Sequence, residues 1–270
     1  MTLKILQTRQ SRTFSQIARK EECLICEQCQ HSANLLRRRS FLKVIGSAST
    51  VAIFGCGLVS EAAHADALTK AQRDEMSPSE IIDVMKKGNE RFRSGVRQNR
   101  NYLNEQKASA SGQYPAAVLL SCIDSRAPAE VIMDLGLGDI FNCRVAGNVA
   151  NPDILGSMEF ACKLAGAKVV LVMGHTACGA IKGAIDNAEL GNLTGLLDKI
   201  KPAVQATNYS GERSAKSYSF VDAVARTNVQ MTMENVRKNS AVLADLESKG
   251  TIKIAGAMYD LQTAALDFLS

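Results

Sequence analysis

Two short segments of the sequence place metal-ligating residues directly after apolar runs. The segment "SCIDSRAPAE" (residues 121–130) follows the run "AAVLL" and offers Cys122. The segment "VVLVMGHTACGA" (residues 169–180) leads from a second apolar run to His175 and Cys178. Two thiolates and one imidazole suit Zn²⁺, and three protein ligands leave a fourth position open, as catalytic zinc sites require. These residues therefore predict one Zn²⁺ per chain.

A carboxylate and a guanidinium follow Cys122 at alternate positions. On extended backbone Asp124 projects to the same side as Cys122, and Arg126 repeats this step. A carboxylate held by a guanidinium beside an open zinc position can accept a hydrogen bond from zinc-bound water and orient it. It can also occupy the fourth position itself and close the site. The residue pattern leaves both arrangements open.

The cysteines of this region also allow another interpretation. His175 and Cys178 could form a base and a thiol nucleophile. Their i, i+3 spacing suits such a dyad poorly, and Cys122 would then have no role. Cys143 and Cys162 are typical of small buried apolar residues rather than ligands.

The elements that must position these residues alternate between strand and helix. Four short apolar runs predict buried strands at residues 117–121, 139–145, 168–174 and 252–258. Helical periodicity is found in residues 128–135, 153–165, 179–188 and 219–248. Alternation of this kind is typical of an α/β fold with a parallel sheet between helices.

The segments before and after these alternating strands and helices have other patterns. Residues 76–92 predict a helix with a capping box at Ser77 and Glu80, and residues 97–114 predict a polar loop. The C-terminal "YDLQTAALDFL" predicts a turn and one short edge strand. We therefore expect a central, mostly parallel sheet of about four parallel strands plus this edge strand, flanked by helices, with an N-terminal helical arm.

This architecture explains why the ligands can meet. Ligands of open parallel sheets bind at the carboxyl ends of the strands. Cys122 follows the first predicted strand, His175 ends the third, and Cys178 precedes a helix that begins near Gly179. The sequence has neither a GxGxxG nor a GxxxxGK[ST] motif in a suitable place, so dinucleotide and P-loop sites are not expected.

The charge distribution argues against a nucleic-acid partner. The net charge is +5, but residues 1–65 hold nine of the 32 Lys and Arg and four of the 27 Asp and Glu. The remaining chain therefore carries 23 charges of each sign and no basic excess. Trp is absent and aromatic residues make up 5% of the chain, which leaves little for base stacking.

Residues 1–65 predict a cleaved leader. "RRSFLK" (38–43) precedes the weakly apolar "VIGSASTVAIFGCGLV" (44–59), and "AHA" (63–65) has the small-x-small pattern of a signal-peptidase site. The arginine pair resembles a twin-arginine signal, which is an address for the export of folded proteins. We expect cleavage after Ala65, a periplasmic location, and no stable membrane insertion after processing.

Four cysteines of the leader have other possible uses. Cys23, Cys26 and Cys29 have a spacing that would suit zinc or an iron–sulfur cluster, but they lie in the part that cleavage removes. Cys56 could be a lipid attachment site, although the large Phe54 precedes it closely.

"CIDSR" (122–126) together with "HTACG" (175–179) resembles the β class of carbonic anhydrases, zinc lyases that hydrate CO₂. The resemblance extends over residues 78–270 and makes residues 66–270 the catalytic domain. It implies that Cys122, His175 and Cys178 bind zinc and that Asp124 and Arg126 are the catalytic dyad. It also implies reversible hydration of CO₂ to bicarbonate and a proton, by attack of zinc-bound hydroxide.

The resemblance further implies substrate contacts and an assembly. Gln113 stands where the plant-type branch has a glutamine that hydrogen-bonds the substrate, and Phe141 stands where an aromatic residue lines the CO₂ pocket. Phe160 replaces a frequent tyrosine, and the backbone N–H of Gly179 would contact the bound anion. The family forms homodimers or larger homo-oligomers, in which Gln113, Phe141 and Phe160 would reach the partner's zinc site.

Two other functions remain open at this level. Related folds hydrolyse CS₂ or COS, and the same zinc chemistry attacks either linear electrophile. The chain could also be a zinc-binding protein without catalytic activity. Such a protein would not need Asp124 and Arg126, and this chain has both residues.

Overall fold

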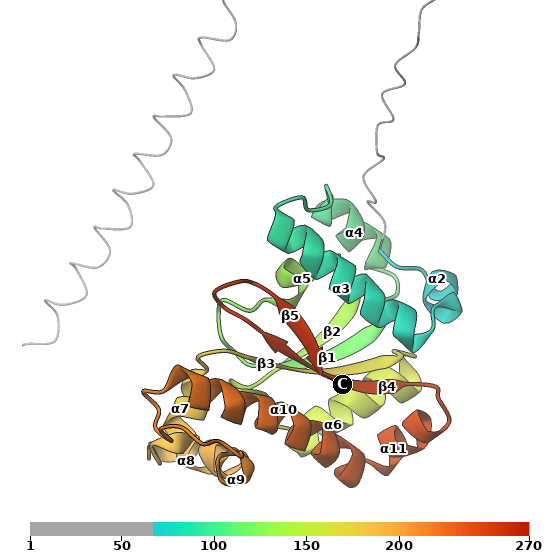
Figure 1. Ribbon diagram of the computed structural model, residues 1–270. Coiled ribbons are helices and arrows are strands. Elements are labelled where there is room, and N and C mark those ends of the chain that lie inside the picture. The colour runs from blue at the N-terminus through green and yellow to red at the C-terminus, as the bar shows by residue number, and fades with distance from the viewer. Residues whose placement is uncertain (1–66, 270) are drawn as a thin grey trace, which may run out of the picture. The chain divides into compact units, whose positions relative to one another are not determined.

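The computed structural model describes residues 67–269 and has a five-stranded sheet at its centre (Figure 1). The strands are β1 (Ala117–Ser121), β2 (Ile140–Arg144), β3 (Val169–His175), β4 (Lys253–Tyr259) and β5 (Leu266–Leu269). β1 to β4 are parallel, and β5 pairs antiparallel with β4. The mostly parallel sheet with a short C-terminal edge strand is therefore confirmed.

The strand order β2-β1-β3-β4-β5 reverses direction at β1. Ala117 of β1 is in register with Ile140 of β2 on one side and with Val169 of β3 on the other. The connections that follow β1 and β3 leave in opposite directions, which opens a crevice beyond the carboxyl ends of these two strands. The order of the strands thus puts the ends of β1 and β3 side by side.

Helices α3 (Pro78–Ser94) and α5 (Ala129–Ile132) cover one face of the sheet. The predicted capping box of α3 is confirmed: the Ser77 hydroxyl accepts from Glu80 N at 3.2 Å, and the Glu80 carboxylate accepts from Ser77 N at 2.7 Å. Ile81 and Met85 are buried on this face. Gly88 permits the close packing, because a Cβ there would lie 1.8 Å from the carbonyl oxygen of Met133.

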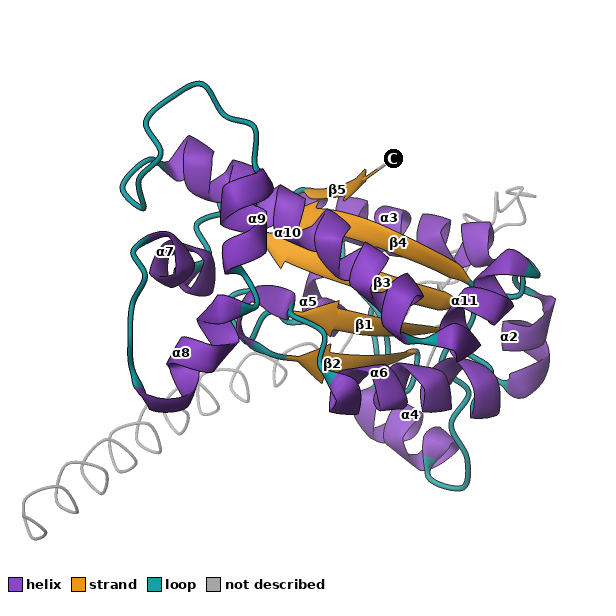
Figure 2. Ribbon diagram, turned by 90° about the horizontal axis from the view of Figure 1, so that it is seen from below, coloured by secondary structure: helices purple, strands orange, loops and turns teal. Residues whose placement is uncertain are grey.

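The opposite face is covered by α6 (Pro152–Glu159) with the π-helical segment η2 (Phe160–Leu164), α10 (Tyr218–Asn239) and α11 (Ala241–Ser248), as Figure 2 shows. The sequence predicted one helix over 219–248, and this is wrong. Ser240 leaves the helical region with φ −127° and ψ 98°, and its hydroxyl accepts from Leu243 N to cap α11. A serine that caps a new helix competes with continuation of the old one.

Helix α7 (Gly179–Ile185) confirms the helix predicted at residues 179–188. The sequence did not predict α2 (Lys70–Glu75), α4 (Tyr102–Ser109), the short 3-10 segment η1 (Ala146–Asn148), α8 (Gly191–Asp198) and α9 (Lys201–Ala206). The polar loop expected at 97–114 contains α4. Glu105 of α4 is fully buried, where Arg100 and the backbone N–H of Leu137 donate to its carboxylate at 3.1 and 2.9 Å. These long-range contacts stabilise a helix that has no apolar stripe of its own.

The predicted leader, with its four cysteines and the cleavage site after Ala65, lies outside the described residues. Among residues 67–269, no helix combines the length and the apolar character needed to cross a membrane.

Candidate metal centre and active site

Cys122, His175 and Cys178 converge in the crevice beyond β1 and β3. Cys122 follows β1 directly, His175 is the last residue of β3, and Cys178 immediately precedes α7. Figure 2 shows α7 and α8 beyond the arrowheads of the parallel strands. The three ligand atoms all lie within 4.8 Å of one another, and the three residues are buried. The predicted convergence is confirmed.

The distances in this cluster fit a tetrahedral metal site. The Sγ atoms of Cys122 and Cys178 are 3.9 Å apart. Two thiolates that bind one Zn²⁺ at about 2.3 Å in tetrahedral geometry would be separated by about 3.8 Å. Sulfur and imidazole nitrogen are also the ligands that favour zinc over magnesium or calcium.

The hydrogen bonds of His175 leave one ring nitrogen free to bind a metal. Its Nδ1 lies 2.9 Å from the carbonyl oxygen of Thr176, and because a carbonyl can only accept, Nδ1 carries the proton. The Nε2 atom is therefore unprotonated in the neutral ring, and it is buried with no hydrogen-bond partner. A buried nitrogen lone pair that is aimed into a thiol cluster fits a metal ligand.

The two thiols are not equivalent. The pKa of Cys122 is lowered to about 4, chiefly because the Cys178 thiol donates a hydrogen bond to its sulfur, while the pKa of Cys178 is raised by the same contact and by burial. The backbone N–H of Gly147 also donates to the Cys122 sulfur at 3.4 Å. Metal binding needs both sulfurs as thiolates, so a divalent cation would displace the proton that lies between them.

Asp124 and Arg126 form a tight ion pair beside the cluster. The Arg126 Nε and Nη2 atoms donate to the two carboxylate oxygens of Asp124 at 3.0 and 2.8 Å, and its backbone N–H donates to Oδ1 at 3.0 Å. These bonds hold the pKa of Asp124 well below its usual range. Asp124 Oδ2 lies 3.8 Å from His175 Nε2, so the carboxylate faces the cluster while Arg126 engages both of its oxygens.

The backbone conformation between Asp124 and Arg126 differs from the prediction. Extended backbone was expected through 122–126, but the chain turns after Asp124, and Ala127 N donates to the Asp124 carbonyl at 3.2 Å. The turn brings the Arg126 backbone N–H and guanidinium to the same carboxylate. Short Asp side chains favour such turns because they accept from the backbone two residues on.

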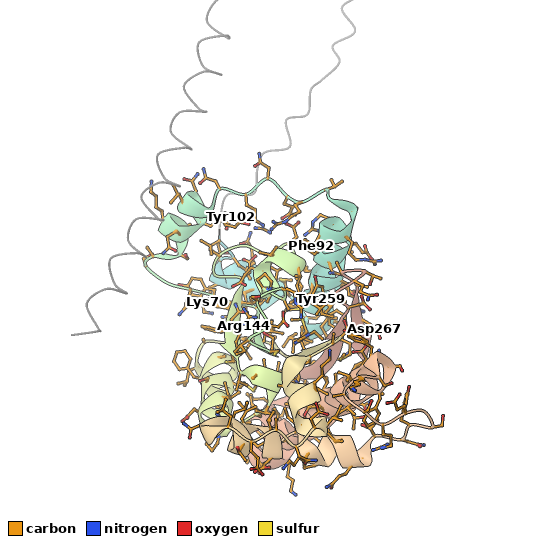
Figure 3. All side chains as sticks on the ribbon, turned by 90° about the vertical axis from the view of Figure 1, so that its left-hand side faces the viewer. Lys70, Phe92, Tyr102, Arg144, Tyr259 and Asp267 are labelled. Carbon is orange, nitrogen blue, oxygen red and sulfur yellow. The ribbon has the colours of Figure 1, made fainter. Side chains whose placement is uncertain are left out.

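Arg144, which is labelled in Figure 3, stabilises the segment that carries Cys122 and Asp124. From the end of β2, its Nε and Nη2 atoms donate to the carbonyl oxygen of Cys122 at 3.0 and 2.8 Å, and Nη2 donates to that of Asp124 at 2.6 Å. Its guanidinium therefore binds backbone carbonyl oxygens and has a structural role.

Sequence reasoning missed two residues of α10 that reach the site. Asp222 accepts a hydrogen bond from Ala177 N, in the turn between two of the predicted ligands, at 2.8 Å. Asn228 donates to the carbonyl oxygen of Gly147 at 2.8 Å. Asn228 is buried and stands on the apolar stripe of α10, four residues after Val224. A polar residue at such a position was the available signal.

Of the four residues predicted to contact the substrate, Gly179 lies beside the metal-ligand cluster, and Gln113, Phe141 and Phe160 lie away from it. Gly179 is exposed and is the first residue of α7, where the N–H groups of the first turn have no partner within the helix. Gln113 precedes β1, whereas Cys122 follows it, and five strand residues span more than about 15 Å. Phe141 is in register with Val118, four residues or about 13 Å along β1 from Cys122.

Phe141 and Phe160 form a pair on the β2 side of the sheet. Their rings contact edge to face with 6.3 Å between centroids, and Phe160 is 53% exposed. They line an open cavity of about 660 Å³ together with residues of β2 and α6. Within one chain, the structure therefore brings Gly179 to the cluster but not Gln113, Phe141 or Phe160.

Comparisons of the sequence and of the structure with known proteins both find carbonic anhydrases. A family model described as "Carbonic anhydrase" matches residues 117–266. Carbonic anhydrase 2 of Mycobacterium tuberculosis is 33% identical over 191 residues, which cover 68% of this chain and 89% of that protein. The carbonic anhydrase of Mycolicibacterium smegmatis is 32% identical over 200 residues, with coverages of 72% and 94%.

Two solved structures are similar in fold. The β-carbonic anhydrase CafA of Aspergillus fumigatus superposes with a TM-score of 0.53 at 29% identity, covering 61% of this chain and 79% of that one. A β-carbonic anhydrase of Sordaria macrospora has a TM-score of 0.53 at 23% identity, with coverages of 60% and 83%, a likeness that concerns the fold alone.

Proposed function

The chain belongs to the carbonic anhydrase family, in its β class, and from this premise we propose that Cys122, His175 and Cys178 hold one Zn²⁺ at which CO₂ and bicarbonate are interconverted. The single observation that supports this most is the cluster of two buried sulfurs 3.9 Å apart with a buried imidazole nitrogen beside them that has no hydrogen-bond partner. The comparisons do not favour CS₂ or COS hydrolysis or a non-catalytic zinc protein.

Bound Zn²⁺ would lower the pKa of water and so supply a nucleophile near neutral pH. Asp124 accepts a hydrogen bond from the attacking water and orients it, and Arg126 keeps Asp124 ionised for this purpose. The backbone N–H of Gly179, at the start of α7, donates to an oxygen of the bicarbonate product. The proton leaves to solvent or buffer.

The same proposal includes a homo-oligomer of at least two chains. Gln113 and Phe141 are too far along β1 and β2 from their own chain's cluster to contact a substrate there. β2 is an edge strand, and the half-exposed Phe160 on η2 packs against Phe141 of this strand. A second copy that covers this edge would bury these side chains, and Gln113, Phe141 and Phe160 would complete the partner's site.

We also propose that residues 1–65 are a twin-arginine leader and that the enzyme acts in the periplasm. "RRSFLK" and "AHA" support this. The short distance between the Cys122 and Cys178 sulfurs adds a physical reason, because two free thiols so close together are prone to oxidation in an oxidising compartment. Folding and metal binding before export would protect both sulfurs.

The direct test is CO₂ hydration by stopped flow with parallel metal analysis of the purified protein. We expect one zinc per chain and rapid hydration, and loss of both in Cys122→Ser. Cys143→Ser is the control, because Cys143 is a half-buried cysteine outside the cluster. A protein without zinc, or a Cys122→Ser variant with undiminished zinc, would refute the metal centre. Zinc without CO₂ hydration would refute the activity.

A further inference from the structure

We propose that α10 is the positioning helix of the metal centre, with Asp222 and Asn228 as its positioning residues. Each holds, by one hydrogen bond, a backbone segment that sets the position of a metal ligand. This inference rests on the proposed metal centre and extends it to residues that are 44 or more positions away from the ligands in the sequence. Neither residue belongs to the motifs that define the site.

Asp222 controls the turn that joins two of the ligands. Its Oδ1 accepts from the backbone N–H of Ala177, which lies between His175 and Cys178. On its other side this turn is held by β4 and the segment after it: Thr176 N donates to the Tyr259 carbonyl at 3.0 Å, and the Thr176 hydroxyl accepts from Leu261 N at 3.0 Å. Asp222 holds the turn from the side of α10.

Ala177 needs such a contact because of its backbone conformation. Its φ is +55°, in the left-handed region that residues with a Cβ avoid and that glycine adopts freely. The direction of the chain from His175 into α7, and hence the place of the Cys178 sulfur, depends on this conformation. The Asp222 hydrogen bond stabilises it.

Asn228 controls the third ligand through Gly147. Its amide donates to the Gly147 carbonyl, and the N–H of Gly147 donates to the Cys122 sulfur. Gly147 has φ +67°, and a Cβ there would lie 2.5 Å from the Cδ1 atom of Ile200, so the segment is closely packed. Asn228 is 3% exposed, and its amide therefore has little freedom to find another partner.

α10 can serve as a fixed reference because it is firmly packed. It is 22 residues long and buries Phe220, Val221, Val224 and Val229 at 0 to 1% exposure. It lies on the face of the sheet opposite α3, and Figure 2 shows it running along the strands. A helix so anchored fixes both ligand-bearing segments before the metal arrives, which lowers the reorganisation that metal binding requires.

The test measures the affinity of the purified protein for Zn²⁺ by chelator competition, and the absorption spectrum of the Co²⁺-substituted protein. Asp222→Ala should lower zinc affinity by about 10- to 100-fold and change the cobalt–thiolate bands. Asp222→Asn keeps an acceptor oxygen without the charge, and it should stay within about threefold of the wild type. Asp267→Ala is the control for loss of a nearby negative charge. Asp267 and Asp222 line one open cavity, but Asp267 pairs with Arg226 rather than with the turn.

A second substitution distinguishes loss of the positioning hydrogen bond from unfolding of the variant. Ala177→Gly adopts a positive φ without strain, so in the Asp222→Ala background it should recover a substantial part of the lost affinity. A variant that had merely unfolded would not be rescued in this way. Failure of rescue in a folded double mutant would overturn the role assigned to Asp222.

Asn228→Leu removes the donor at similar volume and should lower zinc affinity about tenfold, with shifted cobalt–thiolate bands. Thr232→Val is its matched control, because Thr232 is one turn further along α10, is 5% exposed, and contributes no hydrogen bond to a ligand segment. If the wild type binds neither metal, the proposed function fails. If the wild type binds and both α10 variants bind as tightly with unchanged spectra, the metal centre stands and the positioning proposal is wrong.

Discussion

Asp124 accepts three hydrogen bonds from a single residue, two from the Arg126 guanidinium and one from its backbone N–H. Such an arrangement fixes both the orientation of the carboxylate and its charge. Hydrogen bonds to the ionised form lower the pKa, so Asp124 stays a pure acceptor far below neutral pH. The role proposed for it, accepting from a water and orienting it, requires this state.

Asp124→Asn should reduce the turnover number by on the order of 100-fold or more, because an amide accepts more weakly and its NH₂ group would face Arg126. Zinc content should not change, since Asp124 is outside the cluster of three ligands. Stopped-flow kinetics and metal analysis of the same preparation measure both. A fully active variant would contradict the catalytic role, and loss of zinc would make Asp124 a ligand.

The pH dependence of activity should belong to the nucleophilic water and not to Asp124. The lowered pKa of Asp124 keeps it ionised above about pH 4, so activity should rise between about pH 6 and about pH 9 as the water ionises. Asp124→Asn should lower the plateau of this profile and leave its midpoint in place. A flat wild-type profile, or a midpoint that moves by more than about one pH unit in the variant, would contradict this assignment.

Among the elements, the end of α3 and the segment after it are held by one buried carboxylate. Asp134 is fully buried, and its oxygens accept from Arg91 Nε at 2.7 Å, Arg97 Nε at 3.3 Å and Gln98 N at 3.1 Å. Burial would raise the pKa of Asp134, but these hydrogen bonds and the charges of Arg91 and Arg100 outweigh it, and the pKa is lowered. This one side chain therefore ties α3 to the connection between α5 and β2.

Asp134→Asn should lower the free energy of unfolding by about 3 kcal/mol at neutral pH, because it leaves buried donors and an uncompensated positive charge. The native pKa lies below the unfolded value of about 3.9, so the stabilisation is present above that value and is lost as the pH falls through the native pKa. Denaturant unfolding should show a difference between variant and wild type that shrinks below about pH 4.

Asp83→Asn on α3, the helix that carries Arg91, is the matched control. Asp83 is 59% exposed and lies 3.6 Å from Lys86, so its loss should cost less than about 1 kcal/mol. An Asp134→Asn cost equal to that of Asp83→Asn, or a cost that does not decrease in acid, would contradict the proposed tie.

At the scale of the whole molecule, the proposal that Gln113 completes the site of a partner chain predicts that a single chain is inactive. Gly156→Arg on α6 tests this, because Gly156 is exposed, lines the cavity beside Phe141 and Phe160, and has nothing within 4 Å of a Cβ. The variant should fold and bind zinc, sediment as a smaller species, and lose most of its CO₂ hydration.

Gly195→Arg on α8 is the control, since Gly195 is also exposed and has open space at its Cβ, while α8 packs against α7 and α9. It should keep the wild-type assembly and activity. A Gly156→Arg monomer that is fully active would show that no residue of a second chain is needed.

The leader gives a prediction at the same scale. Replacing Arg38 and Arg39 by Lys should leave active, zinc-loaded enzyme in the cytoplasm, because the twin-arginine address is read by a receptor. Cell fractionation with activity assays and N-terminal analysis measures the outcome. Normal export of the double mutant, or a mature chain that does not begin at Asp66, would contradict the proposed leader without affecting the metal centre.

The sequence by itself determined the parallel strands and the residues that cluster at their ends. β1 was predicted with its observed bounds, and the other three parallel strands were predicted to within one or two residues, because an apolar run between turn signals is a local property. Cys122, His175 and Cys178 could be proposed as one cluster because each stands at a strand end or helix start, and such ends share one edge of a parallel sheet. The residue types then indicated zinc.

Only the tertiary structure decided which segments meet and what holds them. The order β2-β1-β3, the placement of Arg144 on the Cys122 carbonyl, and the contacts of Asp222 and Asn228 join residues 22 to 81 positions apart. No local periodicity encodes such pairs. The helix α4 was missed for the same reason, because its buried Glu105 binds the backbone of Leu137, 32 residues away. The break at Ser240 was missed although its signal is local, since the Ser240 hydroxyl caps α11 at Leu243. The separation of Gln113 from Cys122 likewise follows from the length of β1 and from nothing in the motif itself.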